Sequence, residues 1–142
     1  MHVHDQGPLY FNRYSMKLGG RGRVAMPQPL HARFRQAGDR RRYIIFPMRD
    51  PLRLCIMSDT QADFFRAQVR GPLFEFPFRP DRSGVFALER DHAKILGVGP
   101  RDSLVLLGAG PSLELYNAET LEAYMAGDLL AKVEGVDCDF LR

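Results

Sequence analysis

Short apolar runs, each bounded by glycine, proline or charged residues, divide the first half of the chain into brief elements. An extended stretch over 10–17 leads to a glycine-rich turn at 19–22, and the alternation in 23–26 predicts a second strand. A proline pair then precedes a run with apolar residues four apart, which predicts a short helix over 30–37. The pattern favours β-strands with short helical interruptions.

The next apolar runs predict a hairpin followed by a helix. The β-branched and aromatic run 43–46 indicates a buried strand ended by Pro47, and 52–57 returns antiparallel to it. Ser58 and Gln61 match a capping box, in which a hydroxyl and an amide satisfy free donors at a helix start. We expect this helix to run to about residue 69.

The same order of elements recurs about 60 residues later. It comprises an extended stretch, a turn, a strand, a short helix, a hairpin and a final helix: 73–78, 81–84, 85–88, 89–96, 103–107 with 113–116, and 117–126. The interpretation is a tandem repeat; the alternative is chance similarity between two β-rich halves.

The repeat predicts how the chain is organised. We assign 1–9 as an N-terminal extension, 10–70 as the first repeat, 71–127 as the second and 128–142 as a tail. Neither half alone would bury enough apolar surface, so the two should share one core. Closure into a small β-barrel would also remove exposed strand edges. The expected fold class is mainly β with short helices, an α+β fold.

Composition indicates an ordinary globular protein. Of 142 residues, 45% are hydrophobic and 26% charged, and no apolar run is long enough to span a membrane. The N-terminus does not resemble a signal peptide, so a cytoplasmic location is expected. Cys55 and Cys138 lack zinc-ligand spacing and are interpreted as reduced thiols.

Charge is distributed unevenly along the chain. Residues 1–53 hold 11 Lys and Arg against 3 Asp and Glu, a net charge of +8, whereas 54–142 hold 9 against 14, a net charge of −5. A basic half attracts polyanions because each neutralised phosphate releases counterions. Arginine supplies most of the cations, which suits phosphates and guanine edges. The alternative is a solubilising surface with chance asymmetry.

Other chemistry finds little support in the sequence. The glycines of the 19–22 turn are not followed by a phosphate-binding motif, and no catalytic motif is present. His2 and His4 could weakly bind a metal, although a mobile terminus is the preferred interpretation, and His31 and His92 are interpreted as surface residues. We therefore expect no enzyme activity, no cofactor and no small-molecule substrate.

Three segments resemble the MraZ family, whose halves each carry an Asp-x-x-x-Arg motif. Its first-half motif resembles Leu18–Pro27, which reads LGGRGRVAMP, and its second-half motif resembles Asp81–Glu89, which reads DRSGVFALE. The most specific match runs from Leu104 through Asn117. Two motif residues differ, because Gly19 stands where the family has aspartate and Val85 where it has arginine.

This resemblance, over about residues 10–126, implies a swapped AbrB-like barrel, a ring-shaped homo-oligomer and a nucleoid-associated repressor. Such proteins bind short direct repeats in double-stranded DNA upstream of a cell division and cell wall gene cluster. The alternative is a paralogue that kept the ring as a scaffold and lost operator binding. Carried onto this sequence, the principal DNA contacts are Arg21 and Arg23, Asp81 is a motif remnant, and secondary phosphate contacts come from the basic half: Arg13, Lys17, Arg40, Arg41 and Arg42.

Overall fold

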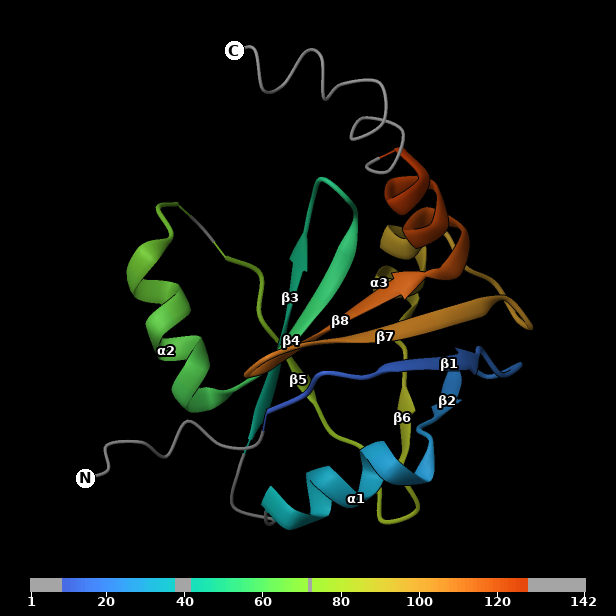
Figure 1. The fold of residues 1–142 in the computed structure, drawn as a ribbon, viewed down its shortest axis with the longest axis horizontal. Coiled ribbons are helices and arrows are strands. Elements are labelled where there is room, and N and C mark those ends of the chain that lie inside the picture. Colours follow the sequence, from blue (N-terminus) through green and yellow to red (C-terminus); the bar gives the residue numbers. More distant parts are fainter. Residues whose placement is uncertain (1–8, 38–41, 72, 128–142) are drawn as a thin grey trace.

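A computed structural model describes residues 9–37, 42–71 and 73–127, and they form an α+β structure (Figure 1). Both halves have the order strand, strand, helix, strand, strand, helix. The elements of the first half are β1 (Arg13–Lys17), β2 (Arg23–Ala25), α1 (Gln28–Ala37), β3 (Tyr43–Met48), β4 (Arg53–Ser58) and α2 (Asp59–Gln68). Those of the second are β5 (Phe76–Phe78), β6 (Val85–Ala87), α3 (Arg90–Leu96), β7 (Ser103–Ala109), β8 (Ser112–Asn117) and a helix over 118–127.

The two halves exchange strands. The larger sheet has six antiparallel strands in the order β1-β7-β8-β4-β3-β5, and β2 and β6 form a separate two-stranded sheet. The first strand of each half thus pairs with the hairpin of the other half, β1 with β7 and β5 with β3. At the centre of the large sheet, Cys55 lies opposite Glu114, and in the small sheet Val24 lies opposite Phe86. Folding of either half therefore depends on the other.

The closed barrel expected from the sequence is not found. In the part of the chain that the structure describes, the large sheet is open, with β1 and β5 as its outer strands. Phe34 of α1 lies between the two outer strands instead. Its ring centroid is 5.5 Å from that of Tyr10, which precedes β1, and 5.7 Å from that of Phe78, which ends β5. Aromatic packing replaces the backbone pairing that would close a barrel.

The large sheet is covered on both faces. Alternate residues of its central strands, such as Leu54 and Leu115, enter the main core together with Val24 and Phe86 of the small sheet. The residues between them face the opposite side, where Met57 packs with Ala62 of α2 and Tyr116 with Leu121 of the C-terminal helix. Successive side chains of a strand point to opposite faces of the sheet, so the position of a residue in its strand decides which core it joins.

Several local expectations can be compared with the structure. Ser58 caps α2 by accepting a hydrogen bond from the Gln61 backbone at 3.2 Å, which confirms the predicted helix start. Pro47 was expected to end β3 but lies within it. Because β5 pairs only with residues 43–45 of β3, the proline interrupts no pairing on that side. No helix of the described residues is long and apolar enough to cross a membrane.

Candidate nucleic-acid interface

Two tight turns with matching hydrogen bonds begin the strands of the small sheet. In the first, the Gly22 N–H donates to the Gly19 carbonyl at 3.1 Å; in the second, the Gly84 N–H donates to the Asp81 carbonyl at 3.0 Å. Gly22 and Gly84 have φ angles of 72° and 86°, a left-handed conformation that favours glycine. The glycines predicted as turn residues are therefore required by the backbone.

Each turn is tied to the strand of the other half. The Leu88 N–H donates to the Gly22 carbonyl at 2.6 Å, and the Met26 N–H donates to the Gly84 carbonyl at 2.9 Å. Since β2 and β6 run antiparallel, the two turns lie at opposite ends of the sheet. We call β2, β6 and the turns 19–22 and 81–84 the ribbon.

The outer face of the ribbon combines one arginine with small side chains. Val24 and Phe86 point inward and are buried, so the alternate residues Arg23, Ala25 and Ala87 point outward and are exposed, beside the half-buried Val85. Arg21 is also exposed, in the first turn. The two principal residues predicted from the sequence therefore lie close together, as neighbours at one end of a solvent-facing surface.

Asp81 stabilises its own turn. Its carboxylate accepts hydrogen bonds from the Val85 N–H at 2.9 Å and from the N–H and hydroxyl of Ser83 at 2.9 and 2.7 Å. These bonds, that of Val85 foremost, hold the pKa of Asp81 below its ordinary value, and the nearby charge of Arg23 adds a smaller effect. No ion pair within 4 Å joins Arg23 to Asp81, two residues that the structure describes. Arg23 is therefore not held by a close carboxylate at this turn.

The secondary residues predicted from the sequence are divided between two places. Arg13 and Lys17 are exposed on β1, and Lys17 ends that strand shortly before the first turn. Arg42 is exposed too, but it directly precedes β3, whose first residue pairs with the last residue of β5. Arg40 and Arg41 lie outside the described residues. Among the described residues, Arg13 and Lys17 thus lie on one outer strand of the large sheet, and Arg42 lies near the other.

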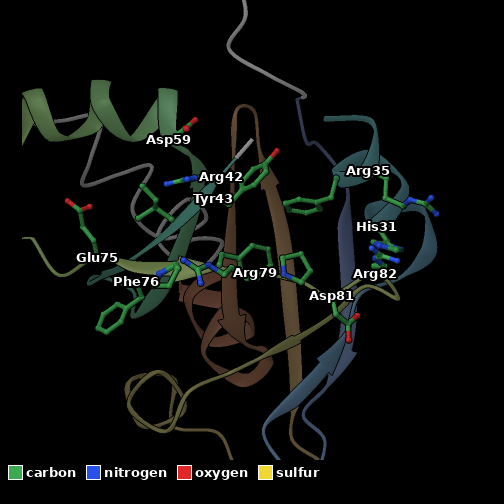
Figure 2. A pocket seen from close by; sticks show the side chains of 15 residues that line it. His31, Arg35, Arg42, Tyr43, Asp59, Glu75, Phe76, Arg79, Asp81 and Arg82 are labelled. Atoms are coloured by element: carbon green, nitrogen blue, oxygen red, sulfur yellow. The ribbon is translucent and has the colours of Figure 1, made fainter. Parts of the chain in front are cut away.

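An open cleft of about 1130 Å³ lies beside the second turn, between α1, β3 and β5 (Figure 2). Four arginines from three separate parts of the sequence line it: Arg35, Arg42, Arg79 and Arg82. No motif in the sequence distinguishes Arg35, Arg79 or Arg82 as a binding residue. The last two lie in the half with net negative charge; strand register brings Arg79 beside Arg42, and the second turn brings Arg82 to the same cleft.

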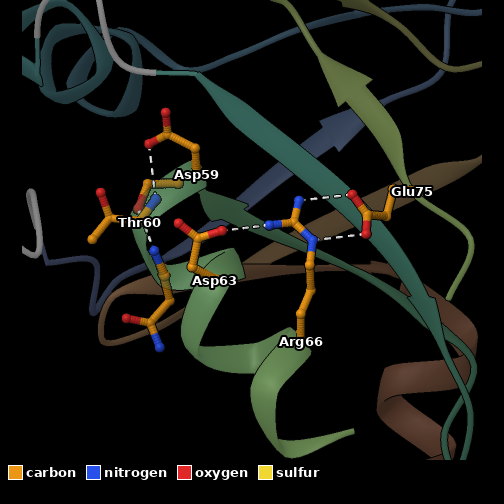
Figure 3. Close-up of polar contacts among 7 residues, drawn as sticks. Asp59, Thr60, Asp63, Arg66 and Glu75 are labelled. Atoms are coloured by element: carbon orange, nitrogen blue, oxygen red, sulfur yellow. Dashed lines mark hydrogen bonds and ion pairs between the residues drawn. The ribbon is translucent and has the colours of Figure 1, made fainter. Parts of the chain in front are cut away.

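The acidic residues at this cleft have partners within the protein. Glu75 forms a two-bond ion pair with the Arg66 guanidinium, at 2.8 and 2.7 Å, and Arg66 also binds Asp63 at 2.7 Å (Figure 3). The hydrogen bond from Arg66 keeps the pKa of Glu75 below its ordinary value. Asp59 accepts a hydrogen bond from the Thr60 N–H at the start of α2. These carboxylates thus hold the local structure in place.

The chain is similar to the transcriptional regulator MraZ of Bifidobacterium longum (strain NCC 2705). The two are 24% identical over 131 residues, and the match covers 84% of each chain. No family model matches the chain.

The two helical histidines are buried, which corrects the prediction that they lie on the surface. His31 is 6% exposed and packs against Gly84, whereas His92 is 1% exposed and its ring lies edge-on to Phe76 at 4.4 Å. Both nitrogens of His92 are buried without a hydrogen-bond partner, and burial lowers its pKa. His2 and His4 lie outside the described residues, among which no cluster of potential metal ligands occurs.

Proposed function

We propose that this protein is a DNA-binding transcriptional regulator that places its ribbon in the major groove. The observation that carries the proposal is the exposed pair Arg21 and Arg23 on an otherwise small-residue surface. The similarity to a transcriptional regulator over 84% of each chain supports the same assignment. On this proposal the protein is not an enzyme, and double-stranded DNA is its ligand.

The ribbon suits the major groove in both shape and chemistry. That groove admits a two-stranded β-ribbon, and arginine can donate two hydrogen bonds to the O6 and N7 acceptors of guanine. Ala25 and Ala87, on the outer face, are small enough to let the backbone approach the base edges, where methyl groups can contact thymine. We assign base reading to Arg23, phosphate or base contact to Arg21, and phosphate contacts to Arg13 and Lys17.

We also propose that the two halves, 10–70 and 71–127, are diverged copies of one unit. Equal element order, the exchange of first strands and the matching turn hydrogen bonds support this origin. Cleavage of the backbone between Arg70 and Leu73 tests the shared core. Neither fragment should then show a cooperative unfolding transition, whereas two separate transitions would contradict the proposal.

Self-association is the second part of the proposal. Large apolar side chains are exposed on and after α2, where Phe64 is 57% exposed and Phe74 71% exposed, and on the C-terminal helix, where Tyr124 and Met125 are about half exposed. We propose that these side chains form contacts between subunits, since exposed apolar patches mark protein interfaces. A ring of subunits would present several ribbons to successive DNA repeats, so weak single contacts would add up to strong binding. A monomer in light scattering at micromolar concentration would contradict this part.

The role in the cell follows from these assignments. We propose a cytoplasmic, nucleoid-associated repressor that binds operator repeats of a cell division and cell wall gene cluster. The competing candidate is a ring-forming scaffold that no longer binds an operator, favoured by the absence of an arginine at Val85 and of an aspartate at Gly19.

A binding measurement separates the two candidates. Duplexes enriched from a random library by the purified protein would be tested by fluorescence anisotropy over a range of salt concentrations. A regulator should enrich a shared sequence and show a steep loss of affinity with salt. An intact oligomer that enriches no sequence and ignores DNA would support the scaffold.

A further inference from the structure

The cleft beside the second turn contains an unfavourable arrangement of charge. Tyr43 at the start of β3 lies opposite Phe78 at the end of β5. Arg42 precedes the tyrosine and Arg79 follows the phenylalanine, so the register, continued by one residue beyond the paired positions, sets the two arginines opposite one another, and both are exposed. Opposite positions of an antiparallel pair have Cβ atoms about 4.5 to 5.5 Å apart, and like charges there destabilise the sheet.

Nothing among the described residues compensates these charges directly. Neither arginine forms an ion pair within 4 Å with a residue that the structure describes. Of the three carboxylates lining the cleft, that of Glu75 is neutralised by Arg66 and that of Asp81 is occupied by its own turn (Figures 2 and 3). The third, that of Asp59, accepts the Thr60 N–H and forms no ion pair with a described residue, although the Asp59 backbone N–H donates to the Arg42 carbonyl. The cleft therefore presents cations whose repulsion a bound anion would relieve.

The corresponding place in the other half of the sheet differs. There β1 ends against β7, and Lys17 lies opposite Ser103, so a single cation meets a neutral side chain. The cleft thus gathers basic side chains from both halves beside the ribbon end that lacks a motif arginine, since Val85 occupies that position.

We propose that Arg42 and Arg79, with Arg82 in the adjoining turn, hold a backbone phosphate of DNA. This inference rests on the proposed function and deepens it. Asp81 connects the two surfaces, because its turn belongs to the ribbon and its side chain also lines the cleft. DNA that lies on the ribbon and continues past the second turn would bring its phosphates to these guanidinium groups. The contacts add affinity for any sequence, while Arg23 reads bases.

The test compares the double variant Arg42→Gln/Arg79→Gln with the control Arg49→Gln. Arg49 is equally exposed but lies in the turn after β3, at the opposite end of that strand. Binding of a random-sequence duplex would be measured from about 50 to about 200 mM salt, where each lost phosphate contact lowers the salt slope by about 0.9. Because the two arginines hold one phosphate, the double variant should lose about 0.9 of the slope, so that its affinity falls roughly 3-fold less than that of the wild type over this range, and the control should match the wild type.

Stability separates binding from a structural role. Because the variant removes repulsion between like charges, its melting temperature should be unchanged or higher; a lower value, with normal DNA binding, would overturn the inference. An unchanged salt slope would also overturn it, whether or not inorganic phosphate binds at the cleft. If Arg21→Ala/Arg23→Ala then still loses binding, the proposed function stands without the cleft. A wild-type protein that binds no DNA would instead remove the proposed function.

Discussion

Replacing Gly84 with alanine tests how the second turn is built. At φ 86° an alanine would pay the cost of a left-handed conformation, about 1 to 2 kcal/mol. Its Cβ atom would also lie 2.8 Å from Cγ of His31 and within 3.2 Å of two further ring atoms. His31 is buried, and the added methyl group would meet its ring rather than the flexible end of a side chain, so overpacking should add about 1 to 3 kcal/mol. The expected loss in the free energy of unfolding is about 2 to 5 kcal/mol.

Gly110 provides the matched control. It has a φ angle of 75°, and an added Cβ atom would meet nothing within 4 Å, so Gly110→Ala should cost only the conformational term. Urea denaturation of both variants gives the comparison, and the double variant Gly84→Ala/His31→Ala measures the coupling between the two sites. A Gly84→Ala variant that is no less stable than Gly110→Ala would refute the close packing of this turn on His31.

Two further predictions concern buried titratable groups. The pKa of His92 is lowered by burial, so as pH falls below about 6.5 the unfolded chain takes up a proton that the folded chain resists, and the free energy of unfolding should fall. His92→Leu should abolish this pH dependence in urea denaturation and stabilise the protein by about 1 to 3 kcal/mol, because two unpartnered nitrogens are removed; persistence of the same pH dependence would contradict it. Burial raises the pKa of Cys55 to about 11, with the charge of Glu114 adding to the shift. In a Cys138→Ser variant, Cys55 should therefore react with a thiol reagent near neutral pH only at the rate of unfolding, and rapid labelling of the folded protein would contradict the structure.

Short-range chemistry made much of the fold predictable. The turn at Gly22 and the capped start of α2 at Ser58 depend on residues within a few positions of one another, and the structure has both. The pairing of β1 with β7 was not predictable in the same way, because it joins residues some 90 positions apart and depends on register. The contacts of Phe34 with Tyr10 and Phe78 likewise depend on tertiary packing.

The candidate site was predictable only in part. Arg21 and Arg23 could be proposed from the sequence because they belong to a recognisable local motif. Arg79 follows a strand of only three residues, and its importance depends on Arg42, which strand pairing brings near it. His92 carried a signal that was missed. It lies four residues before Leu96, so the two share the buried face of α3. Because Glu89, Arg90 and Asp91 directly precede His92, the sequence around it suggested an exposed face of the helix.

The central claim is that Arg21 and Arg23 read DNA from the ribbon. The most direct test is the affinity of Arg21→Ala/Arg23→Ala for the enriched duplex, measured beside its affinity for a random-sequence duplex and its oligomeric state. Each lost base contact should weaken specific binding by about 1 to 3 kcal/mol, while the melting temperature and the oligomer stay as in the wild type. An unchanged affinity for the enriched duplex, in a variant that folds and assembles normally, would contradict the account.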